Sequence, residues 1–428
     1  MPTVGLKLSS WNYKRTLKNS IREKNGALLI TRKSEPRVPP NASFIDGVAC
    51  KDCIIDAITG VSIRVYLPEI CRGFNRAGSK AFSWLPESAS TADESSDFQL
   101  DLRSFFEATE DKSTTSNSSC DDDRSEDFLQ SNGAYYPQRA GHKKLPAIIQ
   151  FHAGAFVNGS KDAPSNDLFC RRIAKACRSV VITVGYRLAP EHKFPSARDD
   201  GLATLRWLAR QANLAIFSSS DCSRKSSSGL IDSFANMLSD PWITAHVDYS
   251  RCVVMGVGAG GTIAEQVTRV AMNMCLELEP LQISAQVLVC PLFSGVTPLP
   301  SEILLSDAYF IDRDTLALIW RLVLPEGENR LDHPAVDPLL PSEVPALKQM
   351  PSTLVVSAEL DMLRDRAAAY VDALQRNNVD ASILTYRAAV HGFVTLECLM
   401  NTRAAQACIE DIAIWFERHV KHVEHDWN

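Results

Sequence analysis

The sequence lacks an apolar run long enough to cross a membrane. Its uncharged stretch from Leu281 to Ser301 contains Gln, several Ser and three Pro, and so predicts a strand followed by a loop. The first residues also lack the short apolar core and small-residue cleavage site of a secretory signal. We therefore expect no membrane span and a cytoplasmic protein. The nucleus is an alternative, and so is an organelle reached by a transit peptide, because residues 1–37 are rich in Lys and Arg.

The chain as a whole has no excess of basic charge. Its 428 residues carry 45 Lys and Arg against 51 Asp and Glu, a formal net charge of -6. This balance argues against nucleic acid as the main partner. The 12 cysteines are scattered, several of them within apolar strand-like runs, which is typical of reduced, buried thiols. Cys50 and Cys53 form a lone CxxC without a second pair, so we interpret them as two unrelated thiols.

No group of metal ligands stands out either. His419, His422 and His425 are spaced i, i+3, i+6, which turns around a helix instead of gathering on one face as zinc ligands do. We interpret them as part of a solvated tail and expect neither a metal nor a cofactor.

One long segment has the composition of a disordered region. Between Trp84 and Gly133 there are 13 Asp and Glu against 3 Lys and Arg, in a Ser/Thr-rich setting that cannot bury much apolar surface. We expect a disordered acidic insertion over residues 73–143, either a tolerated surface insertion or an interaction loop for a protein partner. A shorter polar loop is expected over residues 218–229. Residues 1–40 would form an N-terminal lid, and residues 41–428 a single domain around these insertions.

Outside the insertions, short β-branched runs alternate with amphipathic helical patterns. This rhythm predicts an α/β fold with a mostly parallel, doubly wound sheet and helices on both faces. The expected strands are Ala147–Phe151, Val180–Val184, Cys252–Met255, Ala285–Val289, Thr353–Val356 and Ser382–Tyr386. The expected helices are Asp199–Ala212, Thr262–Leu278, Arg364–Arg376 and Arg403–Val420. Ligands of such sheets bind at the carboxyl ends of the strands, so the residues after each run are the candidates for chemistry.

A glycine-rich turn, Gly256–Gly261, follows the third expected strand and precedes a helix. Strand, tight turn and helix are the setting of a nucleophile elbow, G-x-S-x-G, but the central residue is Gly258. A dinucleotide phosphate cradle is the alternative interpretation, since a glycine-rich turn that opens a helix binds anions. Against it, the order is G-x-G-x-G-G, and no acidic residue follows a strand about 20 residues later.

Other candidate residues follow three more of the expected strands. The small-residue loop His152–Phe156 can turn backbone N–H groups toward an oxyanion, although Ala153 and Ala155 would be strained at positive φ. Asp361 and His391 each follow a late strand, and the order elbow, Asp, His is the chain order of α/β-hydrolases. Asp361 would accept a hydrogen bond from one imidazole nitrogen and leave the other free as a base.

With these motifs, the sequence resembles the plant carboxylesterases of the α/β-hydrolase fold, which are related to hormone-sensitive lipase and the gibberellin receptor. Further segments carry the resemblance: Tyr186–Pro195, Asp240–Trp242, Ser306–Phe310, Leu324–Glu328 and His333–Ala335. The resemblance implies oxyanion donors at the N–H groups of Gly154, Ala155 and Ala259, and an acid and base at Asp361 and His391. The nucleophile position falls on Gly258, and the family's H-G-G-G loop is H-A-G-A here.

The missing hydroxyl decides which functions are expected. Deleting the nucleophile of a serine hydrolase costs about 10⁶ in kcat, so ordinary ester hydrolysis should be lost. One hypothesis is non-covalent elimination, isomerisation or cyclisation with His391 as base, acting on a small apolar molecule with a carbonyl or carboxylate; the family includes a dehydratase. The alternatives are a non-catalytic binding protein resembling the gibberellin receptor, with an N-terminal lid, and weak ester hydrolysis by direct water attack.

Overall fold

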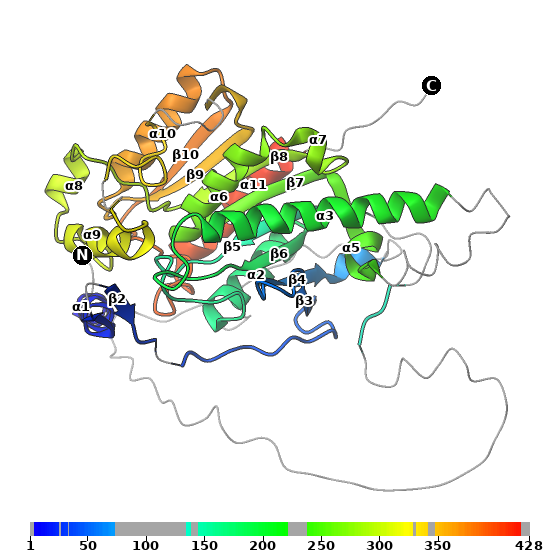
Figure 1. Ribbon diagram of the computed structural model, residues 1–428, viewed down its shortest axis with the longest axis horizontal. Coiled ribbons are helices and arrows are strands. Elements are labelled where there is room, and N and C mark those ends of the chain that lie inside the picture. The colour runs from blue at the N-terminus through cyan, green and yellow to red at the C-terminus, as the bar shows by residue number, and fades with distance from the viewer. Residues whose placement is uncertain are drawn as a thin grey trace, which may run out of the picture. The chain divides into compact units, whose positions relative to one another are not determined.

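An eight-stranded sheet forms the centre of the fold (Figure 1). This computed structural model describes residues 4–24, 27–32, 34–72, 134–137, 144–220, 238–327, 331–340 and 347–420. The order across the sheet is β10-β9-β8-β7-β5-β6-β4-β3. The strands are β3 (Val48–Ile54), β4 (Ser62–Pro68), β5 (Leu145–Phe151), β6 (Val180–Gly185), β7 (Val247–Val257), β8 (Ile283–Val289), β9 (Ser352–Ala358) and β10 (Ala381–Tyr386).

The strand directions confirm the predicted sheet and add a part that sequence patterns missed. From β10 to β6 every neighbouring pair is parallel, and each of the six expected strands lies in this part. β3 and β4 extend the sheet as an antiparallel pair next to β6. β3 is polar at Lys51 and Asp52, so it has no continuous apolar run that would mark it as a strand.

Helices cover both faces of the sheet (Figure 1). One face packs against α3 (Ser196–Ser220), α6 (Ala259–Ala271) and α10 (Arg364–Arg376), and the other against α2 (Pro164–Ala176) and α11 (Arg403–His419). Shorter helices are α5 (Pro241–His246), α7 (Cys275–Leu278), α8 (Pro300–Leu304) and α9 (Arg313–Val323). The single helix expected over Thr262–Leu278 is wrong. α6 ends at Ala271, and α7 begins after a turn at Asn273, a weak helix former.

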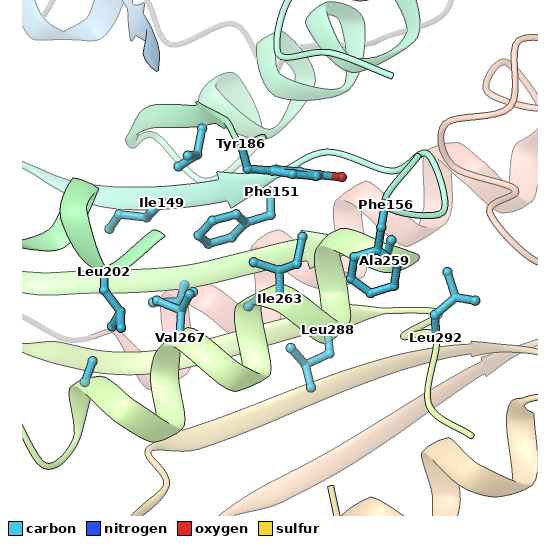
Figure 2. Packing of buried hydrophobic residues seen from close by; sticks show 14 of the residues in the cluster. Ile149, Phe151, Phe156, Tyr186, Leu202, Ala259, Ile263, Val267, Leu288 and Leu292 are labelled. Carbon is cyan, nitrogen blue, oxygen red and sulfur yellow. The ribbon is translucent and has the colours of Figure 1, made fainter. Parts of the chain in front are cut away.

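Alternation along the strands produces the two cores. Ile148, Val253 and Val287 point to the face with α2 and α11. Their chain neighbours Ile149, Val254 and Leu288 point to the face with α6, because successive strand residues face opposite sides. In Figure 2, Ile263 and Val267 of α6 lie against Ile149, Phe151 and Leu288. This packing fixes α6, and therefore the turn before it, against the strand ends.

The N-terminal segment forms helix α1 (Val4–Ser20) and an antiparallel pair, β1 (Ile21–Lys24) and β2 (Ala27–Ile30). It belongs to the same unit as the sheet, which comprises residues 1–73 and 133–428. The expected acidic insertion lies outside the described residues, apart from 134–137. The expected polar loop begins too early, because α3 continues to Ser220. The rest of that loop is also outside the described residues. Among the described helices, none is long and apolar enough to span a membrane.

Candidate functional site

A cavity of about 900 Å³ lies at the carboxyl ends of the parallel strands, within the usual size range of small-molecule sites. Five of the six residues selected from the sequence line it: Gly154, Ala155, Gly258, Ala259 and His391. The sixth, Asp361, lies behind His391 and is hydrogen-bonded to it. The four loops that follow β5, β7, β9 and β10 therefore converge on one place.

His391 and Asp361 form a buried pair. Nδ1 of His391 lies 2.8 Å from Oδ2 of Asp361, and the two residues are 8% and 2% exposed. The other carboxylate oxygen accepts the backbone N–H of Leu363 at 3.0 Å, so both oxygens are engaged. With Nδ1–H donating to the carboxylate, Nε2 carries the lone pair. Nε2 faces the cavity next to Gly258.

Gly258 forms the turn between β7 and α6. Its φ of 58° and ψ of -120° are costly for a residue with a side chain. Its N–H donates to the carbonyl of Val289 at 2.8 Å, and its own carbonyl accepts from Gly261. A Cβ added to Gly258 would lie 3.5 Å from Nε2 of His391 and 3.9 Å from the methyl of Ala153, which are ordinary van der Waals contacts. The turn therefore has room for a side chain that the sequence does not provide.

The flanking glycines have no such room. A Cβ on Gly256 would overlap the carbonyl of Gly260, and a Cβ on Gly260 would overlap the carbonyl of Phe151. Glycine is required at both positions because backbone groups approach directly. Close packing therefore explains the glycines at 256 and 260, whereas Gly258 faces the cavity.

The first part of the β5–α2 loop, residues 152–159, approaches Gly258 from the neighbouring strand end. Gly154 has φ 134°, Ala155 has φ 54° and Phe156 has φ 63°, so two non-glycine residues in succession adopt the left-handed region. The carbonyl of Gly154 accepts the N–H groups of Val157 and Asn158. Within the described part of the chain, no hydrogen-bond acceptor is recorded for the N–H groups of Gly154, Ala155 or Ala259. These donors can therefore serve a ligand in the cavity.

His152, the first residue of this loop, is held in place by Tyr186. Its ring stacks on Tyr186 with centroids 4.1 Å apart, and its Nδ1 lies 2.7 Å from the carbonyl of Ala153. The hydroxyl of Tyr186 donates to the carbonyl of His152 at 2.9 Å. Burial lowers the pKa of His152 to about 4, although its hydrogen bond to Ala153 acts in the opposite direction. His152 is therefore neutral near pH 7 and acts as a fixed part of the framework.

Residues from outside the strand ends also line the cavity. Tyr13 and Leu17 of α1 and Phe310 and Ile311 before α9 line it opposite the strand ends. Tyr13 packs edge-on against Phe310 with ring centroids 5.9 Å apart. Burial, together with the charge of Glu35, raises the pKa of Tyr13 to about 12. The sequence placed Tyr13 and Leu17 only within the expected N-terminal lid, residues 1–40, and the folded chain identifies their neighbours.

Other residues with hydroxyl, thiol or imidazole groups lie elsewhere. Thr262 is buried in α6, outside the cavity lining, and Cys252 is buried in the middle of β7, also outside the lining. The sulfur of Cys50 contacts Arg171, whereas the sulfur of Cys53 contacts Asp240. Of the C-terminal histidines, His419 stacks on Trp415, and the other two are outside the described residues. Among the described residues, no three His, Cys, Asp or Glu side chains are grouped to hold a metal ion.

The fold and the site define the class of this protein. Its mostly parallel sheet carries a strand–turn–helix element at the centre and an Asp–His pair after two later strands, all facing one cavity. The sequence model of the alpha/beta hydrolase fold family matches residues 148–395. The chain belongs to this family and is a carboxylesterase-like member of it.

Two relatives and one solved structure illustrate the relationship. "Probable carboxylesterase 16" of Arabidopsis thaliana is 39% identical, with 100% of both chains covered. Gibberellin receptor GID1B of the same plant is 32% identical over 60% of this chain and 64% of its own. The crystal structure of EstE1, a thermophilic carboxylesterase from a metagenomic library, aligns with a TM-score of 0.56 at 22% identity, covering 98% of this chain and 97% of its own. At this identity the structural likeness supports the fold alone.

Proposed function

We propose that this chain has lost covalent ester hydrolysis and uses His391 as a general base on a small apolar molecule that carries a carbonyl or carboxylate group. The observation that carries the proposal is the hydrogen of Gly258 at the centre of the turn. No acyl-enzyme can form there, because glycine has no nucleophilic atom. The remaining groups are the His391–Asp361 pair and the free N–H groups of the neighbouring loops.

These groups suffice for an elimination. For a β-hydroxy ketone, Nε2 of His391 would take the proton α to the carbonyl, and the electrons would form an enolate. The N–H groups of Gly154, Ala155 and Ala259 would hold the enolate oxygen. The enolate then expels the β-hydroxyl, which takes the proton from His391 and leaves as water. The space left by the missing side chain lets the α-carbon approach Nε2.

Proton exchange tests this proposal directly. Ketones and β-hydroxy ketones with aryl or alicyclic bodies would be incubated in D₂O with the full-length protein, and deuterium incorporation or water loss followed by NMR. The variant His391→Gln should lower the rate about 10²- to 10⁴-fold, the range that a positioned base supplies. His192→Gln is the matched control, since His192 is exposed and lies outside the cavity.

Two results would contradict the proposal. One is an unchanged rate in His391→Gln with a substrate that the wild type converts. The other is a covalent organophosphonate adduct on the peptide that contains residues 256–261, detected by mass spectrometry.

A second function is supported by the cover of the cavity. The side chain of Lys14 on α1 lies 2.8 Å from Asp312, and Ser10 accepts the N–H of Phe310 at 2.9 Å. A cavity lined by such a segment suits a non-catalytic protein that binds a small molecule, and the relatives of this chain include gibberellin receptors. Thermal-shift screening with apolar acids and esters would identify ligands. Ligands that stabilise the protein and remain chemically unchanged would favour binding over catalysis.

A further inference from the structure

Arg32, just after β2, makes a set of contacts that joins the N-terminal segment to the β5–α2 loop. Its Nε donates to the carbonyl of Val157 at 2.5 Å, and one terminal nitrogen donates to the carbonyl of Ala189 at 2.6 Å. Both terminal nitrogens also contact the carboxylate of Glu191, at 2.8 and 2.7 Å. The planar guanidinium thus holds three partners in fixed directions, which an ammonium group cannot do.

These contacts lie where the loop is most strained. Ala155 and Phe156 both have positive φ, which costs free energy for residues with a Cβ. The carbonyl of Phe156 accepts the N–H of Ala189 at 3.0 Å, and the next carbonyl, that of Val157, accepts from Arg32. Since Arg32 also binds the carbonyl of Ala189, the carbonyls of Phe156 and Val157 lie in one ring of hydrogen bonds with Ala189 and Arg32.

The ion pair with Glu191 also fixes the orientation of the Arg32 guanidinium. The hydrogen bond from Arg32 is the main cause that holds the pKa of Glu191 below its ordinary value. The Arg32 side chain is 29% exposed, so part of it is shielded from solvent competition. A two-pronged Arg–carboxylate pair of this kind restricts the guanidinium to one plane.

We propose that Arg32 is a positioning residue that holds the β5–α2 loop with its N–H donors aimed into the cavity. The N-terminal segment then does more than cover the cavity, because it sets the conformation of the donors at Gly154 and Ala155. The catalytic part of this inference rests on the function proposed above, whereas the conformational part does not.

Hydrogen exchange followed by mass spectrometry tests the conformational part. In full-length Arg32→Ala, amides of the peptide containing residues 153–159 should exchange about ten-fold faster than in the wild type. Amides of α10 should be unaffected. Arg32→Lys keeps the charge but not the fork, and we expect an intermediate increase. Lys14→Ala is the matched control, because it removes another contact of the N-terminal segment without touching this loop.

Equal exchange in the loop of Arg32→Ala and wild type would overturn the proposal. An equal increase in Lys14→Ala would also overturn it, since a general loosening of the cover would then be the cause.

Kinetics in the Gly258→Ser background test the catalytic part. If that variant cleaves p-nitrophenyl acetate, adding Arg32→Ala should lower kcat about 100-fold with little change in KM, because misplaced donors act on the transition state. An unchanged kcat would refute the catalytic role of Arg32. If Gly258→Ser cleaves no ester, the hydrogen-exchange result still decides whether Arg32 positions the loop, so the two proposals fail separately.

Discussion

The strand ends on the two sides of the cavity differ in what they provide. After β9 and β10, the chain provides two side chains, Asp361 and His391, joined by a 2.8 Å hydrogen bond and buried. After β7 it provides only backbone, at Gly258, although a Cβ there would meet no obstacle closer than 3.5 Å. The β9–β10 side therefore provides a hydrogen-bonded pair of side chains, whereas the β7 side provides a turn without a side chain.

Under the function proposed above, this difference means that proton transfer can persist without acyl transfer. The imidazole depends on the carboxylate for its orientation and on the cavity for access, and neither depends on a side chain at Gly258. Four predictions test how far the two sides are independent, in order of decreasing expected effect.

A hydroxyl group at position 258 should remove the difference between the two sides of the cavity. In Gly258→Ser the new side chain lies beside Nε2 of His391, so we expect cleavage of p-nitrophenyl acetate to rise about 10³-fold over the wild type. Gly258→Ala is the matched control, since it introduces the same Cβ and the same strain without the hydroxyl. Equal rates in the two variants would mean that the donors or His391 are not poised for acyl transfer.

Substituting a flanking glycine should show that only the central position is open. In Gly260→Ala the new Cβ overlaps the carbonyl of Phe151, so the chain must shift, and we expect a loss of about 3 kcal/mol or more in the free energy of unfolding. Gly258→Ala should lose only about 1–2 kcal/mol, from its positive φ. Urea denaturation measures both values, and a reversed order would contradict the packing described here.

Burial of His152 at the end of β5 should make the stability of the protein depend on pH. The pKa of His152 is lowered to about 4 in the folded state, so below pH 6.5 only the unfolded state binds its proton. His152 should therefore lower stability progressively from pH 6.5 to 4, by roughly 3 kcal/mol in all. Denaturation of His152→Asn should show a flatter pH dependence over that range. An unchanged slope would mean that His152 is protonated in the fold.

The cover of the cavity should contribute least to stability. Burial of Asp312 opposes its charge, but hydrogen bonds from Lys14 and Thr315 outweigh this effect and lower the pKa of Asp312. Lys14→Ala removes two ion pairs, one to Asp312 at 2.8 Å and one to the exposed Asp307 at 3.4 Å, and we expect a loss of at most about 1 kcal/mol that shrinks at high salt. Thermal denaturation at low and high salt measures it. A loss as large as that of Gly260→Ala would mean that the N-terminal segment supports the whole fold.

Local sequence patterns predicted most of the fold and most of the residues of the candidate site. The six β-branched runs all became strands, and the residues after four of them met at the cavity, because the ends of parallel strands share one edge of the sheet. Local patterns failed for β3, whose polar residues interrupt the apolar signal, and for the break between α6 and α7. They also could not foresee that Ala155 and Phe156 would adopt positive φ, since hydrogen bonds from distant Ala189 and Arg32 support that loop.

The sequence by itself determined the chemistry available at each strand end: a hydrogen at Gly258, an imidazole at His391 and a carboxylate at Asp361. These are covalent properties that folding does not alter. Only the tertiary structure decided that Nε2 of His391 faces the gap above Gly258, that Arg32 reaches the β5–α2 loop, and that Tyr13 lines the cavity. Such contacts join residues more than a hundred positions apart, so they arise from how the layers pack and leave no mark in any local stretch of sequence.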